Sequence, residues 1–266
     1  MTSLYNQEVS KFGKKDAMIA LGFFIYFMIR NIVRNIIYSQ FNVSADAWMA
    51  TLIVFNIVDV LIVFIIVKIR KQNLASIGLH KKNIWVAAGL GLLFAPIFIL
   101  SRVLPGIIWE LELSSLGSLL LALIGVTFWA VREDIAFVGF IQTRLHGIVK
   151  SDFWAINLGA TFFTLAHVPT HLAHGIPTGG TVFILLLVNW FFMHRAFVML
   201  FKRHFSLAPV FITHVASNFP SLWQSGGRTG WLWGAIPTVV FVVAVELWYW
   251  RWSESSTDER MRGLSN

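Results

Sequence analysis

The sequence predicts an all-α, polytopic protein of the cell membrane with about eight transmembrane helices and both termini in the cytoplasm. Of its 266 residues, 57% are hydrophobic and only 13% are charged, and the mean hydropathy is +0.71. The apolar residues gather in runs of the length that a helix needs to cross a hydrocarbon core, about 20 residues. Basic residues gather in alternate connections between these runs. Together these observations exclude an ordinary soluble domain.

Eight apolar runs follow one another along the chain. The expected spans are 17–38, 47–69, 84–104, 116–130, 153–173, 181–201, 208–222 and 232–250. The first run carries Arg30 and Arg34 and continues without a small-residue cleavage site, so it is not expected to be a cleaved signal peptide. We expect one membrane-embedded domain over 1–252, followed by a disordered cytoplasmic tail over 253–266 that is charged and Ser-rich.

The net charge of +8 follows the expected topology. Basic residues precede the first span, separate the second from the third and lie near the end of the sixth: Lys11, Lys14, Lys15, Lys68, Arg70, Lys71, Lys81, Lys82, His194, Arg195, Lys202 and Arg203. By the positive-inside rule these connections are cytoplasmic. The charge therefore indicates orientation in a lipid bilayer and no nucleic-acid partner. The chain has no cysteine, which excludes disulfides and thiolate metal sites.

The stretch over 116–149 is too long for a single span. An unbroken helix of that length would measure about 50 Å, and charged residues lie in its middle. We expect a break near Ala130, followed by a second helix or re-entrant piece over 133–145 that is covered by protein.

Three sets of polar residues lie inside these apolar stretches, where an ionisable side chain usually has a function. The first is Arg132-Glu133-Asp134. Neighbouring carboxylates on a helix point about 100° apart, so one would act as a general base and the other would support it. Alternatively, this set is a helix end in cytoplasmic water.

The second set places Phe163 and His167 one helical turn apart. The alternative is a structural histidine that hydrogen-bonds between helices. His171 and His174 follow, so a three-His metal face is conceivable, but Pro169 is expected to interrupt the helix that would align them. We expect His171 and His174 in a loop or at a helix end, and the chain has no His-Glu-x-x-His zinc motif.

The third set places His214 and Asn218 one turn apart, so both can donate hydrogen bonds toward one point. Such a pair suits an oxyanion, where losing one donor costs about 2.7 to 4 kcal/mol of the barrier. The alternative is interhelical hydrogen bonding worth about 1 kcal/mol. Combined, the three sets supply the groups that activate water and hold a tetrahedral intermediate in amide hydrolysis. Ser101, Ser206 and Ser217 lack a Gly-x-Ser-x-Gly setting, which disfavours a serine nucleophile.

These motifs resemble those of the CPBP family, the membrane proteins of the CAAX prenyl endopeptidase and bacteriocin-processing type that are also called the Abi family. The family pattern Glu-Glu-x-x-x-Arg-Gly resembles the segment that begins Glu133-Asp-Ile-Ala-Phe-Val138-Gly, its Phe-x-x-x-His resembles Phe163 to His167, and its His-x-x-x-Asn resembles His214 to Asn218. The resemblance covers roughly 73–218.

The resemblance implies an intramembrane endopeptidase of the glutamate type. Glu133 would be the general base, His167 its partner in activating water, and His214 with Asn218 the oxyanion donors, while Asp134 and Phe163 would support them. The chain departs from the family pattern in having Asp134 for the second Glu and Val138 for the Arg. We therefore expect either that Asp134 is neutral or that Arg132 or Arg144 stands in as its counter-ion.

The sequence leaves three functions open. The first is a peptidase that cleaves a peptide or membrane-protein substrate near the cytoplasmic leaflet without a cofactor, with zinc on Glu133, His167 and His214 as the alternative. The second is a non-catalytic bacteriocin immunity or export-partner protein, which the loss of the motif Arg favours. The third is a transporter, suggested by intramembrane Arg30, Asn56 and Asp59, although no inverted repeat is visible.

Overall fold

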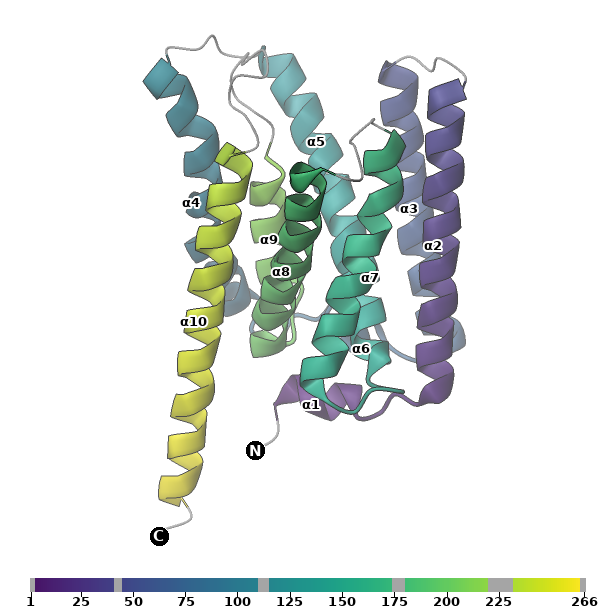
Figure 1. Cartoon of the computed structure of the whole chain (residues 1–266). Helices are drawn as coiled ribbons and strands as arrows, with labels where there is room; N and C mark the ends of the chain where they lie inside the picture. Colours follow the sequence, from purple (N-terminus) through teal and green to yellow (C-terminus); the bar gives the residue numbers. More distant parts are fainter. Residues whose placement is uncertain (1–2, 41–44, 110–114, 174–179, 220–231, 264–266) are drawn as a thin grey trace.

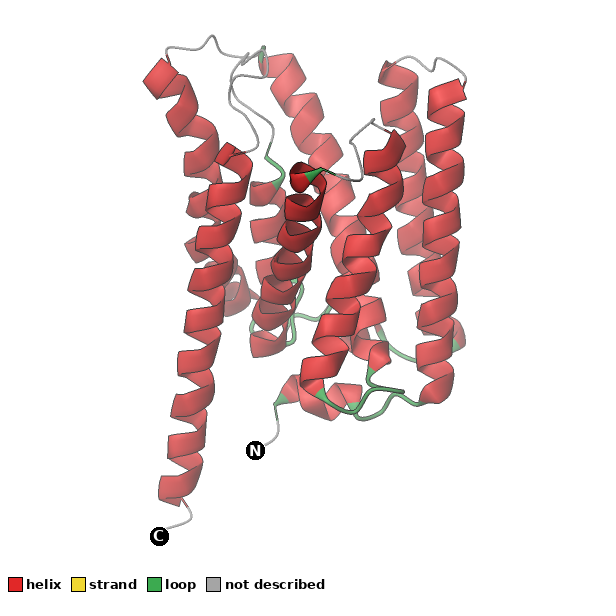
Figure 2. Cartoon of the chain, viewed as in Figure 1, coloured by secondary structure: helices red, strands yellow, loops and turns green. Residues whose placement is uncertain are grey.

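The structure is a computed structural model that describes residues 3–40, 45–109, 115–173, 180–219 and 232–263. Nearly all of these residues are helical, and the described part of the chain contains no strand. Figures 1 and 2 show long helices standing side by side, with one short helix lying across an end of the bundle. The predicted all-α class is confirmed.

In chain order the helices are α1 (Leu4–Val9), α2 (Lys14–Gln40), α3 (Ala45–Ile69), the 3₁₀ helix η1 (Leu74–Ile77), α4 (Ile84–Trp109), α5 (Leu116–Glu133), the π-helix η2 (Asp134–Ile141), α6 (Gln142–Leu145), α7 (Asp152–Ala173), α8 (Thr181–His204), α9 (Ala208–Ser217) and α10 (Leu232–Gly263). Helices α2, α3, α4, α5, α7, α8, α9 and α10 run alternately up and down the bundle, whereas α1 lies across its end (Figure 1).

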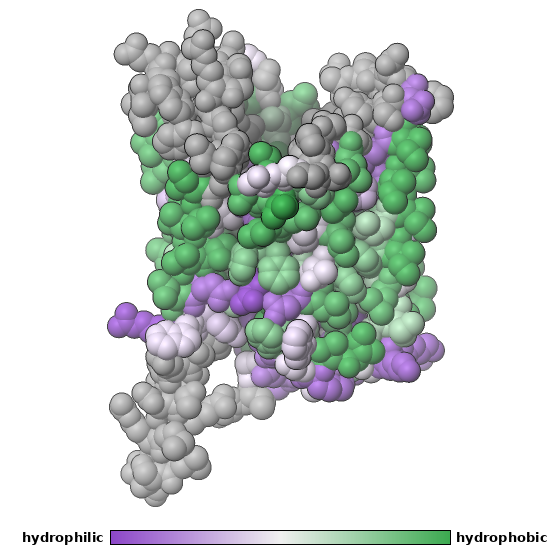
Figure 3. Space-filling view, viewed as in Figure 1, coloured by the Kyte–Doolittle hydropathy of each residue, from purple (hydrophilic) through white to green (hydrophobic). Residues whose placement is uncertain are grey.

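Four stretches among the described residues are long and apolar enough to cross a membrane. They are Lys14–Ile37, Thr51–Ile69, Ile84–Ser101 and Thr181–His204. Many apolar side chains of the bundle face outward, and Figure 3 shows them as a belt above a hydrophilic lower edge. The chain is thus a multi-pass membrane protein. Helix α1 and the end of α10 lie at the same end of the bundle (Figure 1), while the count of eight spans and the cytoplasmic side remain predictions.

The long stretch after Leu116 differs from the expected broken span. Helix α5 continues to Glu133, beyond Ala130, and passes directly into the π-helix η2 and then α6, so the predicted break near Ala130 is wrong. The expected helical piece over 133–145 that is covered by protein is confirmed, because η2 and α6 span 134–145 and are buried. Every residue of η2 is buried. A Cβ on Gly139 would lie 2.8 Å from the Ile77 carbonyl oxygen, so only glycine lets η2 approach η1 this closely. A π-helix inside an α-helical stretch often marks a functional site.

Aromatic packing joins η2 to the helices around it. The ring of Phe137 meets Phe27 of α2 edge-on at 5.0 Å between centroids and Phe163 of α7 at 5.4 Å. All three rings are buried. Because edge-to-face pairs fix relative orientation as well as distance, this stack holds α2 and α7 against the segment that carries Glu133 and Asp134.

The carboxyl-terminal segment also differs from expectation. Helix α10 continues to Gly263, so the structure shows helix in most of the segment predicted to be a disordered tail. The division into a membrane domain over 1–252 and a tail over 253–266 stays a prediction.

Candidate active site

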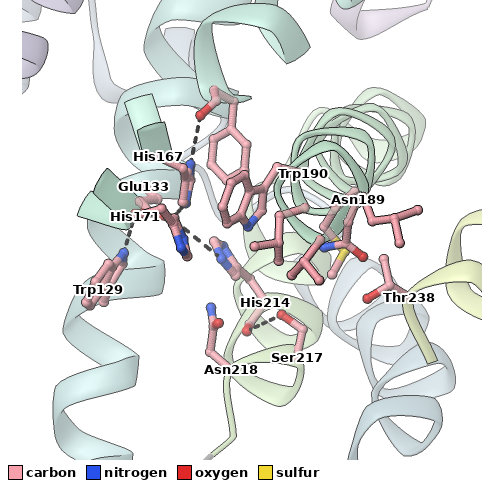
Figure 4. Close-up of a pocket in the computed structure, with 15 residues that line it drawn as sticks. Trp129, Glu133, His167, His171, Asn189, Trp190, His214, Ser217, Asn218 and Thr238 are labelled. Atoms are coloured by element: carbon pink, nitrogen blue, oxygen red, sulfur yellow. Dashed lines mark hydrogen bonds and ion pairs between the residues drawn. The ribbon is translucent and has the colours of Figure 1, made fainter. Parts of the chain in front are cut away.

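A cavity of about 410 Å³ lies among α5, α7, α8, α9 and α10 (Figure 4). Its lining residues are Trp129, Glu133, Phe163, His167, His171, Val182, Leu185, Leu186, Asn189, Trp190, Met193, His214, Ser217, Asn218 and Thr238. The four predicted catalytic residues and Phe163 are all among them. Residues from three segments far apart in the sequence therefore meet at one cavity, as the three polar sets predicted.

The carboxylate of Glu133 lies between two imidazoles. Its Oε2 is 3.8 Å from His167 Nε2 and 3.7 Å from His214 Nε2. Glu133 is the last residue of α5, and its side chain is buried. Figure 4 shows the three side chains turned toward one another. A single water-sized group can therefore contact the acid and either imidazole together.

The imidazole of His167 is oriented by its own helix. Its Nδ1 donates to the carbonyl oxygen of Phe163, one turn earlier, over 2.8 Å. In the neutral ring this leaves the lone pair on Nε2, the nitrogen that faces Glu133. The indole of Trp190 from α8 stacks on the same ring at 4.7 Å between centroids and holds its plane.

The imidazole of His214 is oriented by Asp134. Its Nδ1 donates to Asp134 Oδ1 over 2.7 Å, and both side chains are buried. The second acid of the motif therefore acts through His214 and leaves the Nε2 side of the ring to the cavity. The two adjacent carboxylates approach opposite nitrogens of one ring, Asp134 at Nδ1 and Glu133 at Nε2.

The expected counter-ions of Asp134 are elsewhere. Arg132 pairs with Glu133, and Arg144 donates to Ser76 and Gln72 in the connection between α3 and α4. The prediction that either arginine compensates Asp134 is wrong, because the partner of this carboxylate is the imidazole of His214. Val138, at the position of the motif Arg, is buried in the hydrophobic core.

Asn218 follows the last residue of α9, and its backbone N–H donates to the carbonyl oxygen of His214 over 3.0 Å. Its side chain lies exposed on the cavity wall beside His214 (Figure 4). The one-turn spacing thus places a carboxamide and an imidazole at the same cavity. Their role as a pair of oxyanion donors stays a prediction.

Sequence reasoning missed two tryptophans at the site. Trp129 donates from Nε1 to Glu133 Oε1, and its position one turn before the acid was a signal that could have found it. Trp190 gave no local signal, since it comes from another helix. His194, predicted near the cytoplasmic connection, lies fully buried in α8 and stacks on Phe163 at 4.8 Å.

The predicted interruption at Pro169 is wrong, because α7 continues through this residue to Ala173. His171 therefore lies in the last turn of α7, packs against Trp190 with 4.4 Å between the ring centroids and lines the cavity. His174 lies outside the described residues. Among the residues that the structure describes, no group of three or more His, Asp or Glu side chains is gathered for a metal ion.

Helices long enough to cross a membrane surround a buried carboxylate that faces two imidazoles. The fold and the site together are those of a multi-pass membrane protein with the groups that a water-activating hydrolase needs. A protein-family model, Type II CAAX prenyl endopeptidase Rce1-like, matches residues 115–220. Residues 115–220 are therefore similar to a family of peptidases, which confirms the resemblance to the CPBP family. No curated protein and no solved structure matches the chain significantly.

Proposed function

We propose that this protein is an intramembrane endopeptidase of the cell membrane that hydrolyses a peptide bond near the cytoplasmic leaflet. The observation that carries the proposal is the position of Glu133 Oε2, which lies between His167 Nε2 and His214 Nε2 on the wall of a cavity. The match to a peptidase family over residues 115–220 supports it.

In the proposed mechanism Glu133 is the general base. A water between Glu133 Oε2 and His167 Nε2 donates one hydrogen bond to each, which aims its oxygen lone pair into the cavity. The water oxygen attacks the carbonyl carbon of the scissile bond while its proton passes to Glu133. When the tetrahedral intermediate collapses, Glu133 returns that proton to the leaving amine, so the carboxylate is regenerated.

The oxyanion of the intermediate would be held by His214 and Asn218. With Nδ1–H directed at Asp134, the His214 ring donates from Nε2 when it carries both protons, a form that the Asp134 carboxylate stabilises. The Asn218 carboxamide supplies a second donor from the same wall. No step needs a metal ion, and we propose that the enzyme uses no cofactor.

The cavity suits an apolar peptide segment that lies in or against the bilayer. Val182, Leu185, Leu186 and Met193 of α8 add apolar side chains to the lining of the cavity. The proposed substrates are peptides or membrane proteins, either of the CAAX type or bacteriocin precursors.

The experiment compares cells that make the wild type with cells that make Glu133→Gln or His167→Ala, using mass spectrometry of membrane-associated peptides. An uncleaved precursor should accumulate in cells that make either variant. The bond that is cut in wild-type cells and intact in these cells identifies the substrate and its cleavage site. Ser101→Ala is the matched control, because Ser101 is buried on α4 and its hydroxyl donates within its own helix, to the Phe98 carbonyl oxygen.

A farnesylated peptide ending in a CAAX sequence, with its unprenylated counterpart, tests prenyl recognition on purified protein. Faster cleavage of the farnesylated peptide would assign the CAAX type, and equal rates would favour unprenylated precursors. If Glu133→Gln cells cut every peptide that the wild type cuts, the proposal is wrong.

A second candidate is a non-catalytic bacteriocin immunity or export-partner protein. Val138 in place of the motif Arg is the observation that favours it. Such a protein would protect its producer equally well with His167→Ala or His214→Ala, and no precursor would accumulate.

A further inference from the structure

A buried polar network on α2 and α3 approaches the site from outside the matched residues 115–220. Its members are Tyr26, Arg30 and Asn31 of α2 and Asp59 of α3. Arg30, Asn31 and Asp59 are buried, and Asp59 is fully so. Buried charges in a membrane protein are costly unless they are paired, so their arrangement calls for a function.

Arg132 joins this network to the acid of the site. Its Nη2 pairs with Glu133 Oε1, and its Nη1 lies 3.9 Å from Asp59 Oδ2. The side chain is only 2% exposed, so water cannot screen either interaction. Arg132 and Trp129 both engage Oε1 of Glu133, which leaves Oε2 to face the imidazoles.

Asp59 is the centre of the network. It pairs through Oδ2 with Arg30 and accepts a hydrogen bond at Oδ1 from the Tyr26 hydroxyl over 3.1 Å. The guanidinium carbons of Arg30 and Arg132 lie 4.6 and 4.9 Å from the centroid of the Phe27 ring. The carboxylate of Asp59 therefore offsets the repulsion between two guanidinium groups that pack on one ring.

The network continues to the helix that carries His167. Arg30 Nη1 donates to Asn31 Oδ1 over 2.7 Å, and Asn31 Nδ2 donates to the carbonyl oxygen of Ala166 over 3.2 Å. Ala166 directly precedes His167 on α7. A continuous set of contacts thus runs from Glu133 through Arg132, Asp59, Arg30 and Asn31 back to the neighbour of the imidazole that Glu133 faces.

We propose that Asp59 is a positioning residue that, through Arg132 and Arg30, sets the distance between the Glu133 carboxylate and His167. The inference rests on the proposed function, because it assigns a role in the same reaction. In this interpretation the charges of Arg30 and Asp59 neutralise each other and support the site. They then give no reason to expect a transport path. Asp59 touches no reacting atom, so its effect passes entirely through its partners.

The test uses purified protein and a synthetic peptide. The peptide spans the cleavage site that mass spectrometry of membrane-associated peptides identifies. Asp59→Asn should lower kcat about 10- to 100-fold, because a displacement of about 1 Å at a reacting group can cost as much. KM should change less than about twofold, since no substrate contact is lost. Asp59→Glu, which restores the charge, should recover part of the loss.

Two further variants separate positioning from folding. Tyr26→Phe removes only the hydroxyl that orients Asp59 and should lower kcat by a smaller factor, even where Asp59→Asn fails to fold. Asn56→Ala is the matched control, because Asn56 is buried on the same helix one turn before Asp59 and its Oδ1 accepts no hydrogen bond from the residues that the structure describes. It should leave kcat unchanged.

Two results would overturn the inference while leaving the proposed function intact. One is loss of cleavage in Glu133→Gln with full kcat in both Asp59→Asn and Tyr26→Phe. The other is an equal loss in Asn56→Ala and Tyr26→Phe, which would show general sensitivity of α3 packing. If Glu133→Gln itself keeps full activity, the proposed function is wrong. The positioning role of Asp59, which depends on that function, is then wrong as well.

Discussion

His214 donates from Nδ1 to Asp134 Oδ1 over 2.7 Å, so the second acid of the motif has an imidazole as its partner where the family pattern would supply an arginine. This contact fixes the ring with Nε2 toward Glu133 and the cavity. It also explains how both carboxylates have a partner although Val138 replaces the motif Arg. Asp134 accepts from His214, and Glu133 pairs with Arg132.

Replacing Asp134 with Asn should lower kcat about 10- to 100-fold, because a neutral amide holds the ring in place but does not stabilise its doubly protonated form. Asp134→Glu keeps the charge and should retain most activity. Initial rates on the synthetic cleavage-site peptide measure both. Equal rates for the Asn variant and the wild type would contradict the role of Asp134.

Asn218→Ala should lower kcat about 100- to 1,000-fold if the carboxamide holds the oxyanion. Because the side chain is exposed on the cavity wall, the melting temperature in detergent should hardly change. Asn218→Asp, which removes the donor at similar size, should be as inactive. An active Ala variant would assign the oxyanion to other groups.

Val138→Arg should destabilise the protein by about 3 kcal/mol or more, without raising activity. Val138 is 1% exposed in the hydrophobic core, and the carboxylate that an arginine would pair with is already bound by His214. Thermal unfolding in detergent, with Val138→Leu as an apolar control, measures the cost. An increase in kcat would instead show that an arginine at this motif position supports the site.

Removal of metal ions should leave cleavage unchanged. One oxygen of Glu133 is already engaged by Arg132 and Trp129, and no group of three ligands gathers around a metal position among the described residues. Elemental analysis of purified protein and rates after dialysis against a chelator provide the check. Zinc at one equivalent, with activity lost on its removal and regained on its return, would favour the alternative.

The stability of the protein should fall as the pH decreases below about 6.5, partly because of His146. Burial lowers the pKa of His146 from its ordinary value of 6.5, and nearby Lys202 and Lys150 act in the same direction, while Asp152 opposes them. As the pH falls, the unfolded chain therefore binds this proton before the folded protein does. The contribution of neutral His146 to the free energy of unfolding is complete above pH 6.5 and is lost below it.

His146→Gln should flatten this part of the pH profile. The residue follows α6 at the end of the bundle, and its Nε2 lies 3.1 Å from the hydroxyl of Tyr5 on α1. Thermal unfolding in detergent between about pH 5 and 8 compares the variant with the wild type. Profiles that run parallel throughout would show that His146 does not titrate on unfolding.

The sequence predicts those features of the fold and the site that depend on residues close together in the chain. Apolar runs of membrane length predict helices, and the one-turn spacings of Phe163 with His167 and of His214 with Asn218 predict shared helix faces. The helix through Pro169 and the π-helix after Glu133 were not predicted, because packing against neighbouring helices decides them. The same holds for the contact between Asp59 and Arg132, which are far apart in the sequence and meet only in the folded bundle.

The contact of Arg132 with Asp59 has a consequence for biogenesis. Every motif residue lies in 115–220, as does Arg132, the partner of Glu133, whereas Asp59 of α3 and Arg30 of α2 lie outside this range and hold Arg132 in place. Under the proposed arrangement, a newly made chain reaches its full rate of hydrolysis only when α2 and α3 have packed against α5. Maturation of the fold would thus restrain premature cutting of other newly inserted proteins.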